Sequence, residues 1–170
     1  MNIFLTGDIQ VGKSTAISRF LHAHAWLRLG GFQTVSLPRT DGKAGFALHI
    51  LPPPWRASDA NEANLVGLRG EDRRAFPEVF ESAGVELLLR DGPFDLLLMD
   101  ELGRMELDSP GFCASVLFAL DGNVPVLGVV KPEHNVLLDA VRAHPKTVLL
   151  NVDAANRDSI PAEIERLLFR

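Results

Sequence analysis

The chain has 170 residues, of which 22 are acidic and 17 are Lys or Arg, so its formal net charge is −5 with neutral histidines. A hydrophobic content of 46% with 23% charged residues is typical of a globular protein and argues against a disordered tail. The basic residues are scattered along the chain, which argues against a nucleic-acid-binding surface.

Cys113 is the only cysteine, so an intrachain disulfide is excluded and a reducing cytoplasm is expected. The first apolar run ends at Gly7 and lacks a positive leader, so we expect no signal peptide. No stretch of about 18 apolar residues is present, so we also expect no membrane span. The sequence indicates a cytoplasmic protein, identifies no protein partner, and leaves a monomer as the default.

Short apolar runs alternate with segments of helical spacing, the pattern of a parallel sheet covered by helices. Residues 2–6 are predicted to form a buried strand. Helical spacing follows from Ile17 to Leu27, with a stop expected at residues 30–31. Residues 32–37 and 45–51 are expected to form a β-hairpin.

Three prolines at 52–54 begin a polar segment, which we expect to be an exposed connection reaching about Gly70. Further on, apolar runs predict strands and helical spacing predicts helices. The strands are expected at 94–99, 124–130 and 147–152, and the helices at 77–89, from Pro110, at 135–143 and at 161–169. Residues 1–170 are therefore predicted to be one three-layer α/β domain with a mainly parallel sheet and an inserted β-hairpin.

A glycine-rich segment between the first strand and the first helix matches the pattern Gly, four residues, Gly, Lys, Ser or Thr. Glycines let the backbone curl around phosphates, so that amide N–H groups and the positive end of the helix face the anion. Lys13 is expected to reach the terminal phosphates, and the Ser14 hydroxyl to complete a Mg²⁺ shell. A chance match in a glycine-containing turn is the alternative. The predicted phosphate-binding residues are Gly7, Asp8, Ile9, Gln10, Val11, Gly12, Lys13, Ser14 and Thr15.

Two carboxylates, Asp100 and Glu101, follow the apolar strand at 94–99. Ligands gather at the carboxyl ends of parallel strands, so this pair is expected to meet the phosphate loop. Asp100 would help to hold Mg²⁺, and Glu101 would orient or deprotonate the attacking water. The alternative is two solvated carboxylates at a strand end.

Residues 100–107 read Asp-Glu-Leu-Gly-Arg-Met-Glu-Leu, which closely resembles the signature of a family of small P-loop nucleoside-triphosphatases of the thermophile and human cancer-related type. Residues 30–39, 45–46 and 156–161 are similar to other motifs of that family. The resemblance implies a recombinase-like P-loop fold and Mg²⁺-dependent hydrolysis of several nucleoside triphosphates with weak base preference. Arg104 stands where a lysine is common, and residues 61–74 match poorly.

Three arginines, Arg39, Arg104 and Arg157, are candidates for stabilising charge on the transferring phosphoryl group. A surface salt bridge is the alternative for each. Asn156 and Arg157 follow the last predicted strand, where we expect contact with the base, whereas helix capping is the other interpretation of Asn156.

The leading hypothesis is a Mg²⁺-dependent enzyme that hydrolyses ATP, GTP and other nucleoside triphosphates to diphosphate and phosphate, with Lys13, Glu101, Arg104 and Arg39 as catalytic residues. A nucleotide-dependent switch acting on a partner is a second hypothesis, motivated by the connection at 52–70. A small-molecule kinase is a third, with Arg69, Arg73 and Arg74 as lid arginines.

Overall fold

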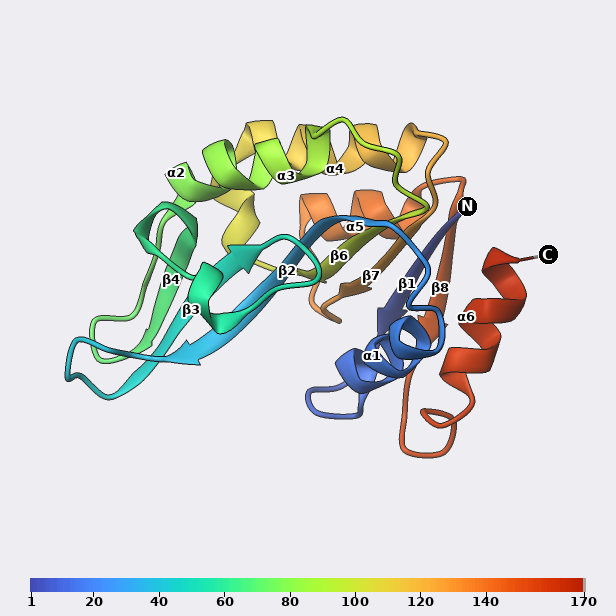
Figure 1. The fold of residues 1–170 in the computed structure, drawn as a ribbon, viewed down its shortest axis with the longest axis horizontal. Coiled ribbons are helices and arrows are strands. Elements are labelled where there is room, and N and C mark those ends of the chain that lie inside the picture. The colour runs from blue at the N-terminus through green and yellow to red at the C-terminus, as the bar shows by residue number, and fades with distance from the viewer. Residues whose placement is uncertain (170) are drawn as a thin grey trace.

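The computed structural model describes residues 1–169, and Arg170, the last residue of the predicted domain, lies outside the described part. One eight-stranded sheet, in the order β5-β4-β3-β2-β6-β7-β1-β8, runs through the molecule, with helices on both of its faces (Figure 1). The strands are β1 (Asn2–Thr6), β2 (Leu29–Pro38), β3 (Gly45–Leu51), β4 (Leu65–Gly70), β5 (Arg74–Ala75), β6 (Leu96–Leu102), β7 (Val126–Val130) and β8 (Thr147–Asn151).

The helices fall between these strands. They are α1 (Lys13–Ala23), α2 (Pro77–Val79), α3 (Val85–Leu89), α4 (Pro110–Asp121), α5 (Val136–Ala143) and α6 (Ile160–Leu168). A π-helical turn, η3 (Phe80–Gly84), joins α2 to α3, and short 3₁₀ turns occur as η1 (Ala57–Asp59), η2 (Glu62–Asn64) and η4 (Met105–Asp108). No helix within residues 1–169 combines the length and the apolar content that crossing a bilayer requires.

The strands β2, β6, β7, β1 and β8 are parallel, and the predicted three-layer, mainly parallel fold is confirmed. The hairpin is confirmed as well, because β3 pairs with β2 in antiparallel fashion. Strands β4 and β5 then continue the antiparallel pairing outward. We call β3, β4 and β5 the antiparallel wing; Figure 1 shows β3 and β4 extending to one side of the parallel strands.

Each face of the sheet buries its own apolar cluster. Under α3 and α4, the ring of Phe112 packs against those of Phe32 and Phe80, with centroid distances of 5.4 and 5.2 Å. On the opposite face, α1 and α6 contribute Ile17 and Ile164 to a second cluster. Strands buried on both faces carry continuous apolar runs, and this is why β1, β6 and β7 were recognisable in the sequence.

Three expectations about element boundaries were wrong. Helix α1 ends at Ala23, and residues 30–31 belong to β2, where they pair with β6 instead of stopping a helix. The segment 52–70 is not only an exposed connection, because β4 pairs with β3 and buries Val66 completely. Strand β6 continues to Leu102, so the two carboxylates lie within its last residues.

Gly31 allows β2 to approach β6, and its replacement provides a test of this packing. Its φ is +83°, and a Cβ atom at this position would lie 2.1 Å from the carbonyl oxygen of Leu98. Gly42, in the hairpin turn, has a similar φ of +80°, but a Cβ atom there would have no neighbouring atom within 4 Å. Gly42→Ala should therefore lower the free energy of unfolding by about 1–2 kcal/mol, through the backbone conformation alone.

Gly31→Ala should lower the free energy of unfolding by clearly more than Gly42→Ala, because the steric clash with a backbone atom adds to the same conformational cost. Urea unfolding of both variants measures the difference. Equal losses would contradict the close approach of the two strands.

Candidate active site

The loop between β1 and α1 has the backbone conformation that a phosphate-binding loop needs. Gly7 and Gly12 have φ values of +135° and +108°, which side-chain-bearing residues rarely adopt. Gly12 is the N-cap of α1, no side chain caps the helix, and no acidic residue lies in its first turn. The first N–H groups of α1 therefore remain available to an anion.

Lys13 lies at the start of α1 with its ammonium group folded over the loop. Its Nζ donates hydrogen bonds to the carbonyl oxygens of Gly7, at 2.7 Å, and of Asp8, at 2.6 Å. Partial burial lowers the pKa of Lys13, while the charges of Glu101, Asp8 and Asp100 act in the opposite direction. These contacts place the cation directly over the cradle formed by the loop.

Asp100 and Glu101 lie near the carboxyl end of β6, the strand next to β7, which in turn is next to β1. Asp100 is 9% exposed, and burial raises its pKa to about 6, with a further contribution from the charge of Glu101. The charge of Lys13 acts on Asp100 in the opposite direction. The carboxylates and the phosphate loop are therefore close enough to interact electrostatically, although 87 residues separate Lys13 from Asp100 in the sequence.

Glu101 is paired with a lysine that the sequence analysis did not single out. The Nζ of Lys131, just after β7, lies 3.1 Å from a carboxylate oxygen of Glu101. Gly103 leaves room for the lysine stem, because a Cβ there would lie 3.0 Å from Cδ of Lys131. Arg142 of α5 fixes this loop, since its Nη2 donates to the carbonyl oxygens of Lys131 and Glu133.

A cleft of about 620 Å³ lies between the phosphate loop and the ends of β6 and β7. Its lining residues are Gly7, Ile9, Gln10, Gly12, Lys13, Ser14, Thr15, Arg69, Glu101, Lys131, Pro132 and Glu133. The structure therefore brings most of the predicted loop together with Glu101 in one cavity, which Asp8, Val11 and Asp100 do not line. Lys131 could have been found from its place after an apolar strand, as Glu101 was, whereas Arg69 belongs to β4, a strand that the sequence analysis missed.

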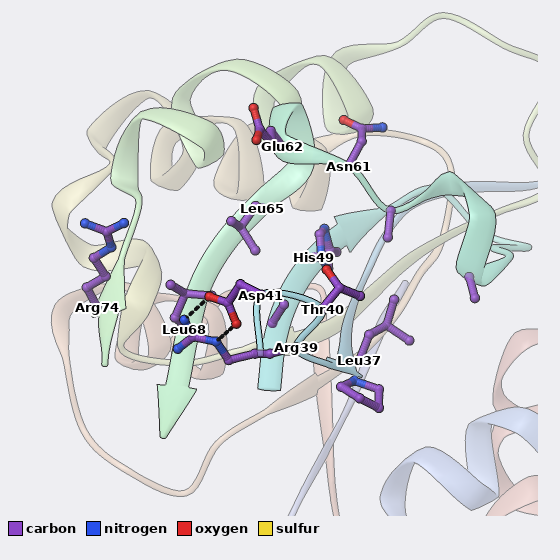
Figure 2. Close-up of a pocket in the computed structure, with 14 residues that line it drawn as sticks. Leu37, Arg39, Thr40, Asp41, His49, Asn61, Glu62, Leu65, Leu68 and Arg74 are labelled. Carbon is purple, nitrogen blue, oxygen red and sulfur yellow. Dashed lines mark hydrogen bonds and ion pairs between the residues drawn. The ribbon is translucent and has the colours of Figure 1, made fainter. Parts of the chain in front are cut away.

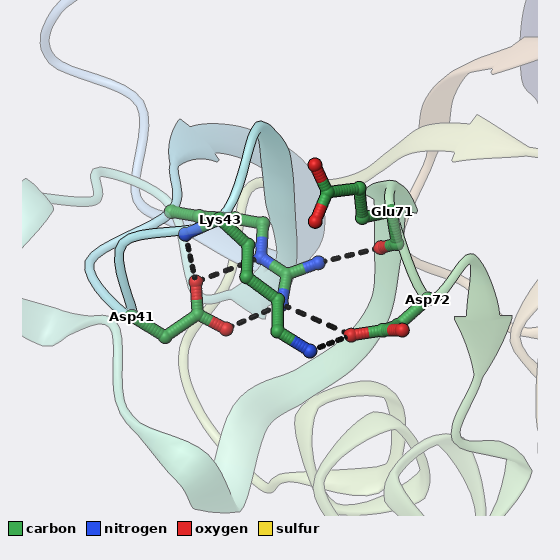
Figure 3. A network of polar contacts seen from close by, with 5 residues as sticks. Asp41, Lys43, Glu71 and Asp72 are labelled. Atoms are coloured by element: carbon green, nitrogen blue, oxygen red, sulfur yellow. Dashed lines mark hydrogen bonds and ion pairs between the residues drawn. The ribbon is translucent and has the colours of Figure 1, made fainter.

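Arg39, one of the predicted catalytic residues, lies outside this cleft. Its guanidinium pairs with Asp41 and donates from Nη1 to the carbonyl oxygen of Glu71 at 2.7 Å, and Asp72 is 4.0 Å away (Figure 3). These contacts raise the pKa of Arg39 and lower that of Asp41 to about 2. Arg39 thus ties the turn of the β2–β3 hairpin to the turn between β4 and β5.

Arg39 also lines a separate cavity of about 470 Å³ on the antiparallel wing, beside His49, Leu65 and Leu68 (Figure 2). This cavity shares no lining residue with the cleft at the phosphate loop.

Arg104, the other predicted catalytic arginine, is exposed at the start of η4 and does not line the cleft. The nearby Glu106 has a structural contact instead: its carboxylate accepts a hydrogen bond from the backbone N–H of Gly103 at 3.0 Å. Burial raises the pKa of Glu106 to about 7. Gly103 and Glu106, both part of the 100–107 motif, therefore hold together the turn that follows β6.

Asn156 and Arg157, which were predicted to contact the base, lie between β8 and α6 and do not line this cleft. Asn156 organises its own loop, accepting from the backbone N–H of Asp153 at 2.9 Å and donating to the carbonyl oxygen of Asn151 at 2.8 Å. Arg157 packs along Gly12, and with Thr15 and Arg19 it lines a hollow of about 180 Å³. A base or ribose bound in this hollow would contact Arg157 directly.

The strand–loop–helix unit, the buried carboxylate on a neighbouring strand and the mainly parallel sheet define a P-loop α/β protein. The model of the NTPase family matches residues 2–165, so the chain belongs to that family.

Curated relatives agree with this assignment, and two solved structures share the fold. The nucleoside-triphosphatase THEP1 of Methanosarcina barkeri is 27% identical over 96% of this chain and 95% of its own length. That of Thermofilum pendens is 28% identical over 97% and 93%. The crystal structure of THEP1 from Aquifex aeolicus covers 100% of both chains with a TM-score of 0.74 and 24% identity. The solution structure of a human cancer-related nucleoside triphosphatase gives a TM-score of 0.70 at 23% identity, over 99% of this chain and 97% of its own.

The raised pKa of Asp100 predicts a pH-dependent loss of stability in the absence of nucleotide and divalent cations. Its folded-state pKa, about 6, exceeds the ordinary value of 3.8, so the folded protein keeps a proton that the unfolded chain releases between these values. The resulting stabilisation is present below about pH 4 and is lost as the pH rises through 6, by about 3 kcal/mol. Urea unfolding of wild type and Asp100→Asn in EDTA measures it. A constant difference between the two proteins from pH 4 to 7 would contradict this environment.

The network around Arg39 predicts a structural effect of its removal. Arg39→Ala should lower the melting temperature, because it unties two turns and leaves the side-chain partner Asp41 unpaired. Arg73→Ala, which removes an exposed arginine of the same wing, is the matched control. If both variants melt at the same temperature, the network does not stabilise the wing.

Proposed function

We propose that this protein hydrolyses nucleoside triphosphates to the diphosphate and phosphate, and that residues 1–170 act as one domain in doing so. The observation that carries the proposal is the single cleft that holds Lys13, Ser14 and Glu101, with Asp100 close enough to influence Lys13. Membership of the NTPase family and the names of its relatives support the same activity.

The donor set fits a Mg²⁺ ion carried by the substrate. Within residues 1–169, no cluster of three or more His, Cys, Asp or Glu side chains could hold a metal alone. Mg²⁺ is commonly bound through one or two protein oxygens together with substrate phosphates and water. The Ser14 hydroxyl and the Asp100 carboxylate would hold it here, and when bound it neutralises phosphate charge.

The protein's own groups have separable roles in the proposed reaction. The loop Gly7 to Thr15 would bind the phosphates through its backbone N–H groups, and Lys13 would exchange its carbonyl partners for phosphate oxygens. Glu101 would orient the attacking water and accept its proton, while the pair with Lys131 holds the carboxylate in place. Asn156 and Arg157 would border the nucleoside, without a pattern that selects one base.

Glu101 distinguishes hydrolysis from the two other hypotheses, since a switch or a kinase does not depend on a water-activating carboxylate in the same way. Glu101→Gln should lower kcat by about 10²–10⁴-fold and leave binding of a non-hydrolysable analogue intact. The measurement is phosphate release from ATP, GTP, CTP and UTP. No release by wild type above a blank, or full activity of Glu101→Gln, would contradict the proposal, and transfer of labelled phosphate to an acceptor would favour a kinase.

Lys13 provides the matching test of binding. Lys13→Ala should abolish tight binding of the triphosphate analogue, because it removes the cation that lies over the phosphate cradle. Lys43→Ala removes a lysine of the hairpin turn, where it pairs with Asp72, and serves as the control with the same change in charge. Isothermal titration with the analogue measures both. Equal affinities for the two variants would place the phosphates elsewhere.

A further inference from the structure

The cleft at the phosphate loop contains three cations, Lys13, Lys131 and Arg69. The two lysines are engaged: Lys13 bonds to loop carbonyls, and Lys131 pairs with Glu101. Within residues 1–169, none of the ion pairs or side-chain hydrogen bonds involves the guanidinium of Arg69. A cation that faces a phosphate-binding cleft without a carboxylate partner has its donors available for a ligand.

The register of the antiparallel wing determines the side from which Arg69 reaches the cleft. Successive residues of a strand point to opposite faces of the sheet. Leu68 lines the separate cavity of the wing, so Arg69, the next residue, points to the other face, where it lies opposite Phe46 of β3. The wing therefore presents one face to its own cavity and directs Arg69 toward the phosphate loop.

The backbone that carries Arg69 is anchored on both sides. Gly70 and Gly45 are paired between β4 and β3, and a Cβ atom on Gly45 would lie 1.9 Å from the carbonyl oxygen of Arg69, which shows how closely the two strands approach. Arg39 donates to the carbonyl oxygen of Glu71, only two residues further along the chain. The backbone position of Arg69 is thus set by the wing, and its side chain lines the cleft.

We propose that Arg69 is the residue that stabilises charge on the transferring phosphoryl group, supplied by the same chain. This inference rests on the proposed hydrolysis and assigns to β4 a role for which the sequence analysis named Arg39, Arg104 and Arg157 as candidates. A guanidinium matches the geometry of phosphate oxygens through several N–H donors, and such an arginine accelerates phosphoryl transfer by orders of magnitude.

The proposed reaction is an ordinary hydrolysis of the β,γ-phosphoanhydride bond. The oxygen of water forms a bond to the γ-phosphorus, and the bond between that phosphorus and the β,γ-bridging oxygen breaks. Glu101 accepts the proton of the water, and the electron pair of the broken bond stays on the diphosphate. Arg69 donates hydrogen bonds to the γ-phosphoryl oxygens, or to the bridging oxygen, as negative charge shifts during the transfer.

The test compares Arg69→Ala, Arg69→Lys and, as a control, Arg90→Ala, which removes an exposed arginine at the end of α3, in the full chain. For Arg69→Ala we expect kcat to fall on the order of 10³-fold, while the Kd for a non-hydrolysable triphosphate analogue changes by less than about threefold. Binding of the diphosphate with aluminium fluoride, which imitates the transferring group, should weaken strongly in the same variant. Arg69→Lys should recover part of kcat, and Arg90→Ala should behave as wild type.

The outcomes separate the two proposals. If wild type hydrolyses triphosphates and Arg69→Ala retains kcat within about threefold, the role of Arg69 is overturned and the proposed function stands. An equal loss in analogue affinity and in aluminium fluoride binding would make Arg69 a residue for ground-state binding, which also overturns the inference. A wild type that releases no phosphate overturns both. Melting curves confirm that each variant is folded, and Arg69→Lys keeps the test valid if the alanine variant unfolds.

Discussion

Backbone hydrogen bonds of β7 to β1 on one side and to β6 on the other hold the two halves of the site at a fixed separation. Adjacent strands lie about 4.8 Å apart, so the ends of β1 and β6 are about 10 Å apart, a gap that a lysine and a carboxylate can bridge together with a phosphate. The parallel direction of the three strands puts both carboxyl ends at the same edge. Without this alignment, the phosphate loop and Glu101 would have no common cavity.

The electrostatics of the site follow from that geometry. Asp100 is buried beside a second carboxylate, so its pKa lies near 6, and a nearby cation is what would favour its charged form. The charge of Lys13 acts in this direction, and a divalent cation brought by a nucleotide would act more strongly. Glu101, the second carboxylate, is partly exposed to water, and it is paired with the ammonium group of Lys131. Two neighbouring acids therefore have distinct environments and distinct proposed tasks.

The antiparallel wing adds a component that the parallel core lacks. Its strands extend the sheet away from the core, yet Arg69 of β4 returns to the cleft, and the Arg39 network holds together the turns at the end of the wing. Arg39 therefore contacts the turn that follows the strand carrying Arg69. The backbone of β4 thus connects the Arg39 network with the cleft.

Local signals in the sequence were sufficient for the phosphate loop and for most of the strands and helices. The glycine spacing of residues 7–15 and the continuous apolar runs of β1, β6 and β7 depend on short-range backbone and burial requirements. The same logic correctly expected the parallel sheet, the hairpin, and the proximity of Glu101 to Lys13. Strand β4 was missed because Leu65–Gly70 is short, contains two glycines and follows a proline-rich segment, so that only its pairing with β3 makes it a strand.

Which cations besides Lys13 face the cleft was decided by the tertiary structure alone. Arg39 looked suitable in the sequence, but Asp72, 33 residues away, and the carbonyl of Glu71 surround it once the wing has formed. Lys131 was not singled out in the sequence, and Arg69 was named only as a lid arginine of the kinase hypothesis. Strand order and register direct both of them into the same cavity. A guanidinium or ammonium group carries no local signal of its partner, because long side chains interact with whatever the fold brings near them.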